Sequence, residues 1–205
     1  MIKTVLWDFD GVILDSMKIK GDGFTSLFKG FDEEHLVQIE QYHYANGGVS
    51  RFEKIRYFYK NIIKQPIDEE MVTKLADNFS KIILKDVFNK NNLIKETLKF
   101  IQNNYKKYNF HIVSGSEHNE LNNICKNFKL NYYFLSIDGS PAKKNDLVKK
   151  IINQYGYNRE EVALIGDAMS DYNASIENGI RFYGYNNIKL KSLDYYIDTF
   201  NGLKV

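Results

Sequence analysis

Two aspartates at the end of an apolar run are the residues of this sequence that most strongly suggest chemistry. Residues 4–7 are apolar or β-branched, Asp8 and Asp10 follow, and Gly11 ends the stretch, which is typical of a buried strand. Side chains two apart on a strand point to the same side, so both carboxylates would face one region. They would be costly inside a core but not at the carboxyl end of a strand, where open α/β sheets place their ligands.

A second acidic pair occurs in the C-terminal half of the chain. Residues 162–165 form another apolar run, which leads to Asp167, and Asp171 follows four residues later. Because the carboxyl ends of parallel strands lie at one edge of a sheet, this pair would meet the first. Four carboxylates would repel one another without a cation, and an oxygen-only ligand set favours Mg²⁺ over zinc. The predicted metal ligands are Asp8, Asp10, Asp167 and Asp171.

Donors for a phosphoryl group follow the strand predicted at residues 110–113. Ser114, Gly115 and Ser116 come at its end, and the serine hydroxyl and glycine-flanked amides can donate to phosphoryl oxygens. Lys144, at the start of a predicted helix, could supply further positive charge. Magnesium held by a few carboxylates normally meets a substrate phosphate, so the set fits phosphoryl transfer, with an aspartate as nucleophile. Each residue alone would more often be a helix cap or a surface residue, so the prediction depends on the whole set.

Alternating apolar runs and helical patterns predict the fold class. Helices are expected at 93–106, 117–128, 144–155 and 170–178, strands at 110–113, 133–137, 162–165 and 181–185, and a last helix and short edge segment within 190–205. This alternation implies right-handed crossovers and an α/β fold, a Rossmann-like doubly wound parallel sheet. Residues 17 to about 90 show only helical spacing, so they predict an inserted α-helical cap domain. The expected domains are a core of residues 1–15 and 91–205 and a cap of residues 16–90.

Apolar stripes in the predicted cap are expected to pack in its core rather than to bind a ligand. The third stripe consists of Met71, Leu75, Phe79, Ile82 and Ile83. The first consists of Phe24, Leu27, Phe28 and Phe31, and the second of Phe52, Ile55, Phe58, Tyr59, Ile62 and Ile63. His111, in the predicted strand 110–113, is expected to be a half-buried structural residue.

Composition limits the partners and the location of the protein. The formal net charge of the 205 residues is +2, so neither a nucleic acid nor a membrane surface is an expected partner. The single Cys125 excludes an internal disulfide and suits a reducing compartment. No apolar run approaches the roughly 18 to 20 residues of a membrane span or matches a signal peptide. We expect a soluble, cytoplasmic protein, whose oligomeric state the sequence does not indicate.

The four sets of residues described above resemble the motifs of the haloacid dehalogenase-like superfamily, subclass I, which carries a helical cap after the first strand. The matching residues are 8–12, Ser114, Lys144 and 166–171. The resemblance implies a Mg²⁺-dependent reaction in two steps, in which Asp8 attacks phosphorus and forms an aspartyl phosphate. Asp10 would protonate the leaving oxygen and then deprotonate the attacking water, which needs a pKa near neutrality, while its backbone carbonyl binds the metal.

The remaining roles also follow from this resemblance. Ser114 would donate a hydrogen bond to the phosphoryl group, and Lys144 would steady both Asp8 and that group, although Lys143 could serve instead. Asp167 would bind Mg²⁺ directly, and Asp171 would bind it directly or lie just outside its ligands.

Substrate specificity is the feature on which members of the superfamily differ, such as phosphoglycolate phosphatase and β-phosphoglucomutase. Residues 48–51 are similar to a cap stretch of β-phosphoglucomutase whose arginine contacts a substrate phosphate, so Arg51, with Gly115 and Ser116, is predicted to bind substrate. Lys20 stands where that enzyme has a histidine, and no second basic cap residue matches near residues 75–76. A mutase must hold a bisphosphate and exclude water, so missing cap cations favour hydrolysis.

The predicted function is therefore a Mg²⁺-dependent phosphatase of a small phosphorylated metabolite, a phosphosugar or a similar phosphomonoester. The alternatives are a sugar phosphomutase of the β-phosphoglucomutase type and a non-catalytic protein that binds a phosphorylated metabolite. A dehalogenase is disfavoured, because attack on carbon needs neither Asp10 nor the metal carboxylates.

Overall fold

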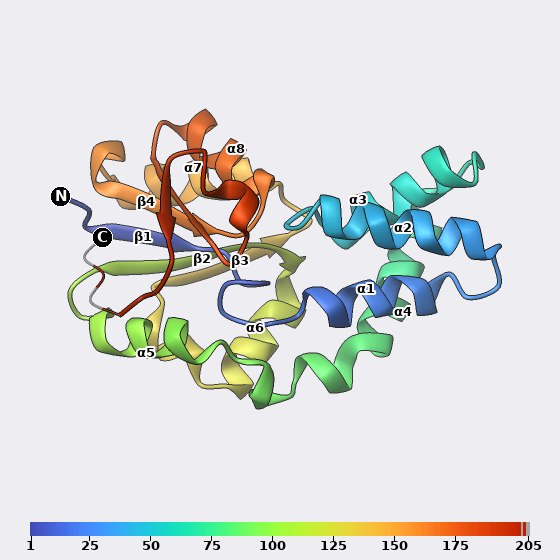
Figure 1. Cartoon of the computed structure of the whole chain (residues 1–205), viewed down its shortest axis with the longest axis horizontal. Helices are drawn as coiled ribbons and strands as arrows, with labels where there is room; N and C mark the ends of the chain where they lie inside the picture. Colours follow the sequence, from blue (N-terminus) through green and yellow to red (C-terminus); the bar gives the residue numbers. More distant parts are fainter. Residues whose placement is uncertain (202, 204–205) are drawn as a thin grey trace.

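The computed structural model describes residues 1–201 and 203, and within them the chain forms one parallel six-stranded sheet (Figure 1). The strands are β1 (Thr4–Trp7), β2 (Asn109–Glu117), β3 (Ser136–Ser140), β4 (Val162–Gly166), β5 (Arg181–Tyr185) and β6 (Tyr195–Ile197). Their order is β3-β2-β1-β4-β5-β6, so the first strand is central and pairs with β2 and β4. The order reverses between β1 and β4, and a doubly wound sheet binds ligands at the carboxyl ends of such a strand pair. The predicted fold class is confirmed.

Helices cover both faces of this sheet, which explains why its strands read as continuous apolar runs. α5 (Lys95–Asn104) and α6 (His118–Asn127) lie on one face, and α7 (Lys144–Tyr155) and α8 (Met169–Asn178) lie on the other (Figure 1). Successive side chains of β1 pack on opposite faces of the sheet. Trp7 packs edge-on against Phe110 with ring centroids 5.3 Å apart, whereas Leu6 belongs to the cluster that the apolar side of α7 covers.

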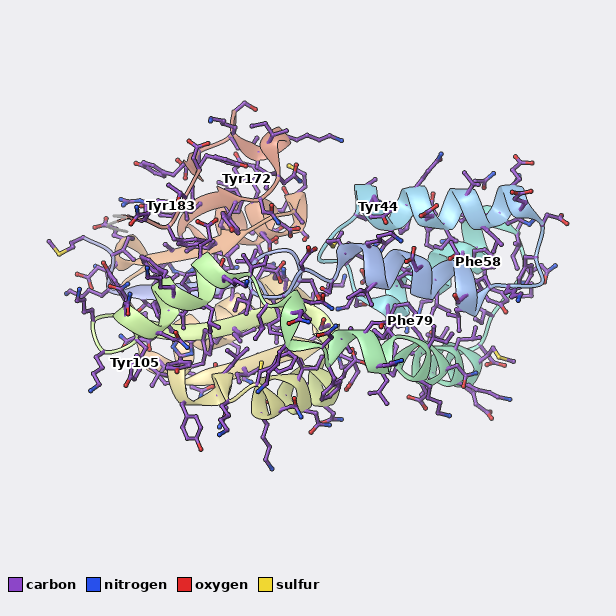
Figure 2. All side chains as sticks on the ribbon, turned by 60° about the horizontal axis from the view of Figure 1, so that its bottom comes forward. Tyr44, Phe58, Phe79, Tyr105, Tyr172 and Tyr183 are labelled. Carbon is purple, nitrogen blue, oxygen red and sulfur yellow. The ribbon has the colours of Figure 1, made fainter. Side chains whose placement is uncertain are left out.

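A helical insert, residues 17–87, separates β1 from the rest of the sheet. It consists of α1 (Met17–Leu27), α2 (Glu33–Ala45), α3 (Arg51–Tyr57) and α4 (Glu69–Val87), and a π-helical turn, Phe58–Ile62, continues α3. The insert lies to the right of the sheet in Figure 1. Aromatic pairs fill its interior: Phe28 stacks on Phe58 with ring centroids 3.7 Å apart, and Phe24 packs at a tilt against Phe79 at 4.3 Å. Phe58 and Phe79 are labelled in Figure 2.

Two strands differ from the prediction. β2 does not stop before Ser114 but runs to Glu117, with a register shift against β3 between Val113 and Glu117, so the serines lie in an irregular strand rather than in a turn. An irregularity of this kind re-aims side chains next to a site. β3 begins at Ser136 and not at Tyr133, which belongs to a 3-10 turn. β3 is an edge strand, so pairing with β2 rather than local propensity decides its extent.

The predicted core of the insert and the predicted tail need smaller corrections. Met71 and Ile82 are exposed, because α4 buries a neighbouring face instead: Val72, Ala76, Phe79, Ile83 and Val87. Phe31 is also partly exposed. The expected edge segment is β6, but the described part of the tail forms only a 3-10 turn, Ile188–Leu190, in place of an α-helix, and residues 202, 204 and 205 lie outside the described residues.

None of the helices in the described part of the chain combines the length and apolarity that crossing a membrane requires.

Candidate active site

Three of the four predicted acidic residues meet where the strand order of the sheet reverses, whereas the carboxylate of Asp10 contacts Lys20 and Ser116 instead. Asp8 directly follows β1, and its backbone N–H still donates to the carbonyl of Ile165 in β4 at 2.9 Å. Asp167 directly follows β4. One carboxylate oxygen from each of Asp8, Asp167 and Asp171 lies within 4.8 Å of the others. Asp8 and Asp167, more than 150 positions apart in the sequence, therefore lie together at one sheet edge as predicted, but the predicted set of four carboxylates does not include Asp10 in this cluster.

The acidic cluster is buried, and two of its carboxylate oxygens have no hydrogen-bond donor within the described residues. Both Asp8 and Asp167 are buried, and Asp8 Oδ2 and Asp167 Oδ1 have no hydrogen-bond partner. Gly11 makes the approach of Asp167 possible: its φ is +76°, and a Cβ atom at this position would lie 2.0 Å from Asp167 Oδ2. Buried carboxylate oxygens without donors are costly in the absence of a cation, so these two oxygens fit the ligand set of a hard dication.

Lys144 is the lysine that joins the cluster. At the first turn of α7, it places its Nζ atom 2.8 Å from Asp8 Oδ1 and in contact with Asp171 Oδ1. Lys143, the alternative, is exposed. Asp171 is not a solvated helix residue, because it is fully buried and its Oδ2 accepts from the backbone N–H of Ala168 at 3.1 Å. Both oxygens of Asp171 thus have donors, unlike those of Asp167.

The pKa shifts of these groups show the same imbalance. Burial, and then the charge of Asp171, raise the pKa of Asp8 to about 7, although Lys144 acts in the opposite direction. Burial and the charges of Asp8 and Asp171 raise the pKa of Asp167 well above its usual value. Three carboxylates facing one ammonium leave a net negative charge, and a divalent cation would offset it.

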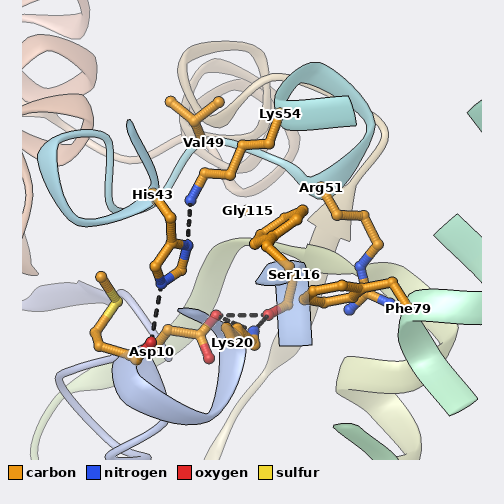
Figure 3. Close-up of a pocket in the computed structure, with 12 residues that line it drawn as sticks. Asp10, Lys20, His43, Val49, Arg51, Lys54, Phe79, Gly115 and Ser116 are labelled. Carbon is orange, nitrogen blue, oxygen red and sulfur yellow. Dashed lines mark hydrogen bonds and ion pairs between the residues drawn. The ribbon is translucent and has the colours of Figure 1, made fainter. Parts of the chain in front are cut away.

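The two serines predicted to bind phosphate are buried, and Ser116 contacts the carboxylate of Asp10. Ser114 is buried, and its Oγ accepts from the backbone N–H of Ser116 at 3.1 Å. Ser116 Oγ donates to Asp10 Oδ2 at 2.6 Å, and Lys20 Nζ lies 2.6 Å from both of these oxygens. Lys20 comes from α1, so this contact joins the helical insert to the sheet edge (Figure 3).

The expected pKa of Asp10 is wrong for this arrangement. A pKa near neutrality was expected for a group that both gives and accepts a proton. Burial acts in that direction, but the ammonium of Lys20 and hydrogen bonds from Ser116 and Ser16 outweigh it and hold the pKa of Asp10 well below its usual range. Asp10 is therefore a carboxylate while Lys20 touches it.

The insert lies directly on the site. Ser170, beside Asp171, donates to the carbonyl oxygen of Gly47 at 3.0 Å. At Gly48, which has φ +74°, a Cβ atom would lie 2.3 Å from Ser170 Oγ and 3.2 Å from Lys144 Nζ. A Cβ on Gly115 would lie 2.1 Å from the carbonyl oxygen of Gly48. The loop before α3 thus packs on the sheet edge with no room for side chains.

Arg51, the predicted substrate-binding residue, is buried at the same junction. Its guanidinium forms a two-pronged ion pair with Glu120 of α6, contacts Ser80 of α4, and lies over the ring of Phe79 at 4.8 Å. Arg51 lines the pocket between insert and sheet, but its charge already has a carboxylate partner (Figure 3).

Lys54 and His43 also line this pocket and were not identified from the sequence. Lys54 stands three residues after Arg51 in α3, so both lie on one face of this helix. This spacing is the sequence feature from which Lys54 could have been predicted to line the same pocket as Arg51. Glu120, the partner of Arg51, could have been suspected because it shares a helix face with the apolar Ile124.

Comparisons with known proteins agree with this architecture. A family model described as "Haloacid dehalogenase-like hydrolase" matches residues 5–185. The protein named Phosphoglycolate phosphatase 1 of Saccharolobus solfataricus is 28% identical over 191 residues, covering 83% of this chain and 77% of that protein. The structure of β-phosphoglucomutase from Clostridium difficile superimposes with a TM-score of 0.78 at 17% identity, covering 100% of this chain and 94% of the other. A predicted phosphoglycolate phosphatase from Haemophilus somnus gives 0.74 at 16%, with 97% and 95% covered.

The fold and the site define an α/β enzyme with a cluster of buried carboxylates at the switch point of a Rossmann-like sheet and a helical insert after its first strand. The chain belongs to the haloacid dehalogenase-like hydrolases, since the family match spans nearly all of both parts. The expected superfamily and the expected enzyme class, a phosphatase of this kind, are confirmed.

Proposed function

We propose that this protein is a Mg²⁺-dependent phosphatase that hydrolyses a small phosphorylated metabolite, a phosphosugar or a similar phosphomonoester. One observation carries the proposal: buried oxygens of Asp8 and Asp167 lie without donors beside Lys144, at the switch point of the sheet. The similarity to a protein named phosphoglycolate phosphatase supports hydrolysis. The metal would neutralise the carboxylates and the phosphoryl oxygens, so that an anionic nucleophile can approach an anionic substrate.

The side chains around the proposed metal site have distinct roles in this proposal. Asp8 attacks phosphorus and becomes the aspartyl phosphate, while Lys144, 2.8 Å from Asp8, orients it and donates to the phosphoryl group. Asp167 and the backbone carbonyl of Asp10 hold the metal with Asp8. Asp171, whose oxygens already accept from Lys144 and Ala168, fixes Lys144 instead of binding the metal directly. Ser114 donates to a phosphoryl oxygen.

Asp10 would transfer protons in both steps, as acid to the leaving oxygen and as base to the attacking water. It can be the acid only after it gains a proton, which Lys20 opposes in the arrangement seen here. Lys20 belongs to α1 of the insert and Asp10 to the sheet edge. We propose that Lys20 moves away from Asp10 when the substrate enters the closed site, which frees Asp10 for protonation before the attack.

The helical insert would act as the cap of the enzyme, within the expected boundaries of residues 16–90, and the remainder would form the core. Its contacts at Gly48 and Ser170 would exclude water during the attack on phosphorus. Arg51, Gly115 and Ser116 line the pocket that would receive the rest of the substrate. A location in the cytoplasm belongs to the same proposal.

Release of inorganic phosphate from p-nitrophenyl phosphate tests this function. We expect turnover with Mg²⁺ that stops with EDTA and in Asp8→Asn. Asp77→Asn, which removes the same charge from an exposed position of α4, serves as the matched control. Turnover that persists in EDTA or in Asp8→Asn contradicts the proposal.

A sugar phosphomutase is the second candidate, because the insert packs against Gly115 and Lys144 closely enough to exclude water from the site. A mutase would interconvert two hexose phosphates with no net release of phosphate, so an assay with a hexose phosphate that measures both isomerisation and phosphate release distinguishes the two functions. A protein that only binds a phosphorylated metabolite would show affinity without either reaction.

A further inference from the structure

The pocket between insert and sheet contains three cationic side chains, and two of them are neutralised by the protein itself. Lys20 pairs with Asp10 at 2.6 Å, and Arg51 pairs with Glu120 through both of its terminal nitrogens. The third cation, Lys54, forms no ion pair with any carboxylate in residues 1–201 and 203. Lys54 is therefore the one lysine or arginine of this pocket that has no carboxylate partner within the described residues.

The surroundings of Lys54 are unusual for a lysine. The side chain is buried, and its Nζ atom lies 3.0 Å from His43 Nδ1 and 5.7 Å from the ring centre of Phe24. His43 Nε2 lies 2.9 Å from the carbonyl oxygen of Met17, which can only accept, so Nε2 carries the proton and Nδ1 accepts from Lys54. A neutral imidazole cannot offset a charge, which explains why burial lowers the pKa of Lys54 to about 7.

A purely structural role does not explain this lysine. A methionine or leucine would fill the same space between α1 and α2 without the cost of burying an ammonium group. The lysine instead points into the pocket that Asp10, Gly115 and Ser116 also line (Figure 3). Asp10 is the residue proposed to protonate the leaving oxygen, so Lys54 faces the part of the substrate that leaves.

We propose that Lys54 binds a second negatively charged group on the leaving part of the substrate, and that this group is a carboxylate. The proposal rests on the phosphatase function proposed above. Lys54 would be a specificity-determining residue that distinguishes a phosphorylated hydroxy acid from an uncharged phosphomonoester. One oxyanion would neutralise Lys54 in the way that Asp10 and Glu120 neutralise the other two cations.

The size of the pocket favours a carboxylate over a second phosphate. Its cavity volume is about 30 Å³, and about half of that volume is enough for one water molecule. The cavity therefore has room for about two water-sized groups, which matches a carboxylate better than a phosphate or a phosphorylated sugar, since both of these are larger.

Binding measurements on a protein that cannot turn over test the proposal separately from hydrolysis. Isothermal titration calorimetry with Mg²⁺ compares 2-phosphoglycolate and ethyl phosphate, which differ by the carboxylate, on Asp8→Asn. The same titrations use Asp8→Asn combined with Lys54→Met, Lys54→Arg or Lys60→Met. Lys60, exposed on the π-helical turn that continues α3, is the matched control.

We expect Asp8→Asn to bind 2-phosphoglycolate more tightly than ethyl phosphate. Lys54→Met should weaken 2-phosphoglycolate about 10- to 100-fold, as the loss of a hydrogen bond between charged groups does, and leave ethyl phosphate unchanged. Lys54→Arg should retain part of the preference, and Lys60→Met should retain all of it. Because Lys54→Met removes an unbalanced buried charge, we expect it to fold and to melt no lower than its parent.

Three results would overturn the proposal. Asp8→Asn could show no preference between the two ligands, or Lys54→Met could weaken both equally, as a structural role would. Tighter binding of a sugar 1,5-bisphosphate than of 2-phosphoglycolate, lost in Lys54→Met, would assign the site to a second phosphate instead. Absence of phosphate release by the wild type, together with the expected binding pattern, would refute the phosphatase function and leave the anion site in place.

Discussion

Replacing Asp167 with asparagine should stabilise the protein without metal and destabilise it with metal. Asp167 faces the carboxylates of Asp8 and Asp171 and the ammonium of Lys144, with carboxylate oxygens within 4.8 Å of one another. At that distance and an effective dielectric constant of about 20, one pair of like charges repels by about 3 kcal/mol. The repulsion of Asp167 by Asp8 and Asp171 exceeds its attraction to Lys144 by roughly the energy of one pair of like charges. Protonation of Asp167 removes part of this repulsion. We expect Asp167→Asn to gain about 1 to 3 kcal/mol in EDTA.

Thermal unfolding is the assay for this prediction. For a chain of this length, each kcal/mol shifts the melting temperature by about 2 to 4 °C, so the melting temperature of the variant in EDTA should be several degrees higher. In Mg²⁺ at about 100 times its dissociation constant, the wild type gains about 2.7 kcal/mol. The variant has a neutral amide in place of the carboxylate whose Oδ1 is unpaired, so it should gain much less, and the order of the two melting temperatures reverses.

Asp77→Asn separates this effect from a general loss of negative charge, because Asp77 is exposed on α4, outside the metal site. Its melting temperature should follow the wild type in both conditions. An Asp167→Asn protein that melts lower than the wild type in EDTA, or that responds equally to Mg²⁺, would refute the electrostatic account of the site.

Three other perturbations test separate parts of the structure. Lys144→Met should reduce phosphate release at least 100-fold because Lys144 contacts Asp8 and Asp171, whereas Lys143→Met, at an exposed position, should stay within about twofold. Gly48→Ala should raise KM and lower the melting temperature, because φ is +74° and the new Cβ would lie 2.3 Å from Ser170 Oγ. His111 is fully buried with a pKa lowered to about 4 from 6.5, mainly by burial, so the unfolded chain binds the proton first. His111 should therefore contribute a loss of about 3 kcal/mol to the stability measured by urea unfolding as the pH drops from 6.5 to 4, and His111→Gln should remove that contribution.

The sheet and its acidic edge could be predicted because both depend on local patterns. α7 and β5 have the predicted bounds, since each is a periodic run ended by a glycine or a polar residue. Asp8 and Asp167 could be placed together because each follows a buried strand, and parallel strands share one carboxyl edge. His111 was expected to be half-buried, but it is fully buried because Ser136 and Tyr157, distant in sequence, satisfy its two nitrogens.

Contacts between the insert and the sheet could not be predicted in the same way. The partner of Arg51 lies 69 positions away on α6, and the partner of Lys20 is Asp10 across the junction. Sequence spacing shows only which residues share a helix face, not how the insert is placed over the sheet. The predicted pKa of Asp10 is wrong for the same reason, because Lys20, which lowers this pKa, belongs to the insert.

The unbalanced charges on the two sides of Asp10 have opposite signs, and this links the metal, the substrate and the position of the insert. On one side the carboxylates of Asp8, Asp167 and Asp171 share the single ammonium of Lys144, and on the other side Lys54 has no carboxylate partner within residues 1–201 and 203. When the insert covers the sheet edge, it removes water from the acidic cluster and from Lys54. Loss of this hydration costs free energy at both places, which opposes closure of the ligand-free protein. A dication at one end and a substrate carboxylate at the other would each remove one penalty. Closure should therefore be most favourable when metal and substrate are both bound, so that the site excludes water when Asp8 is ready to attack.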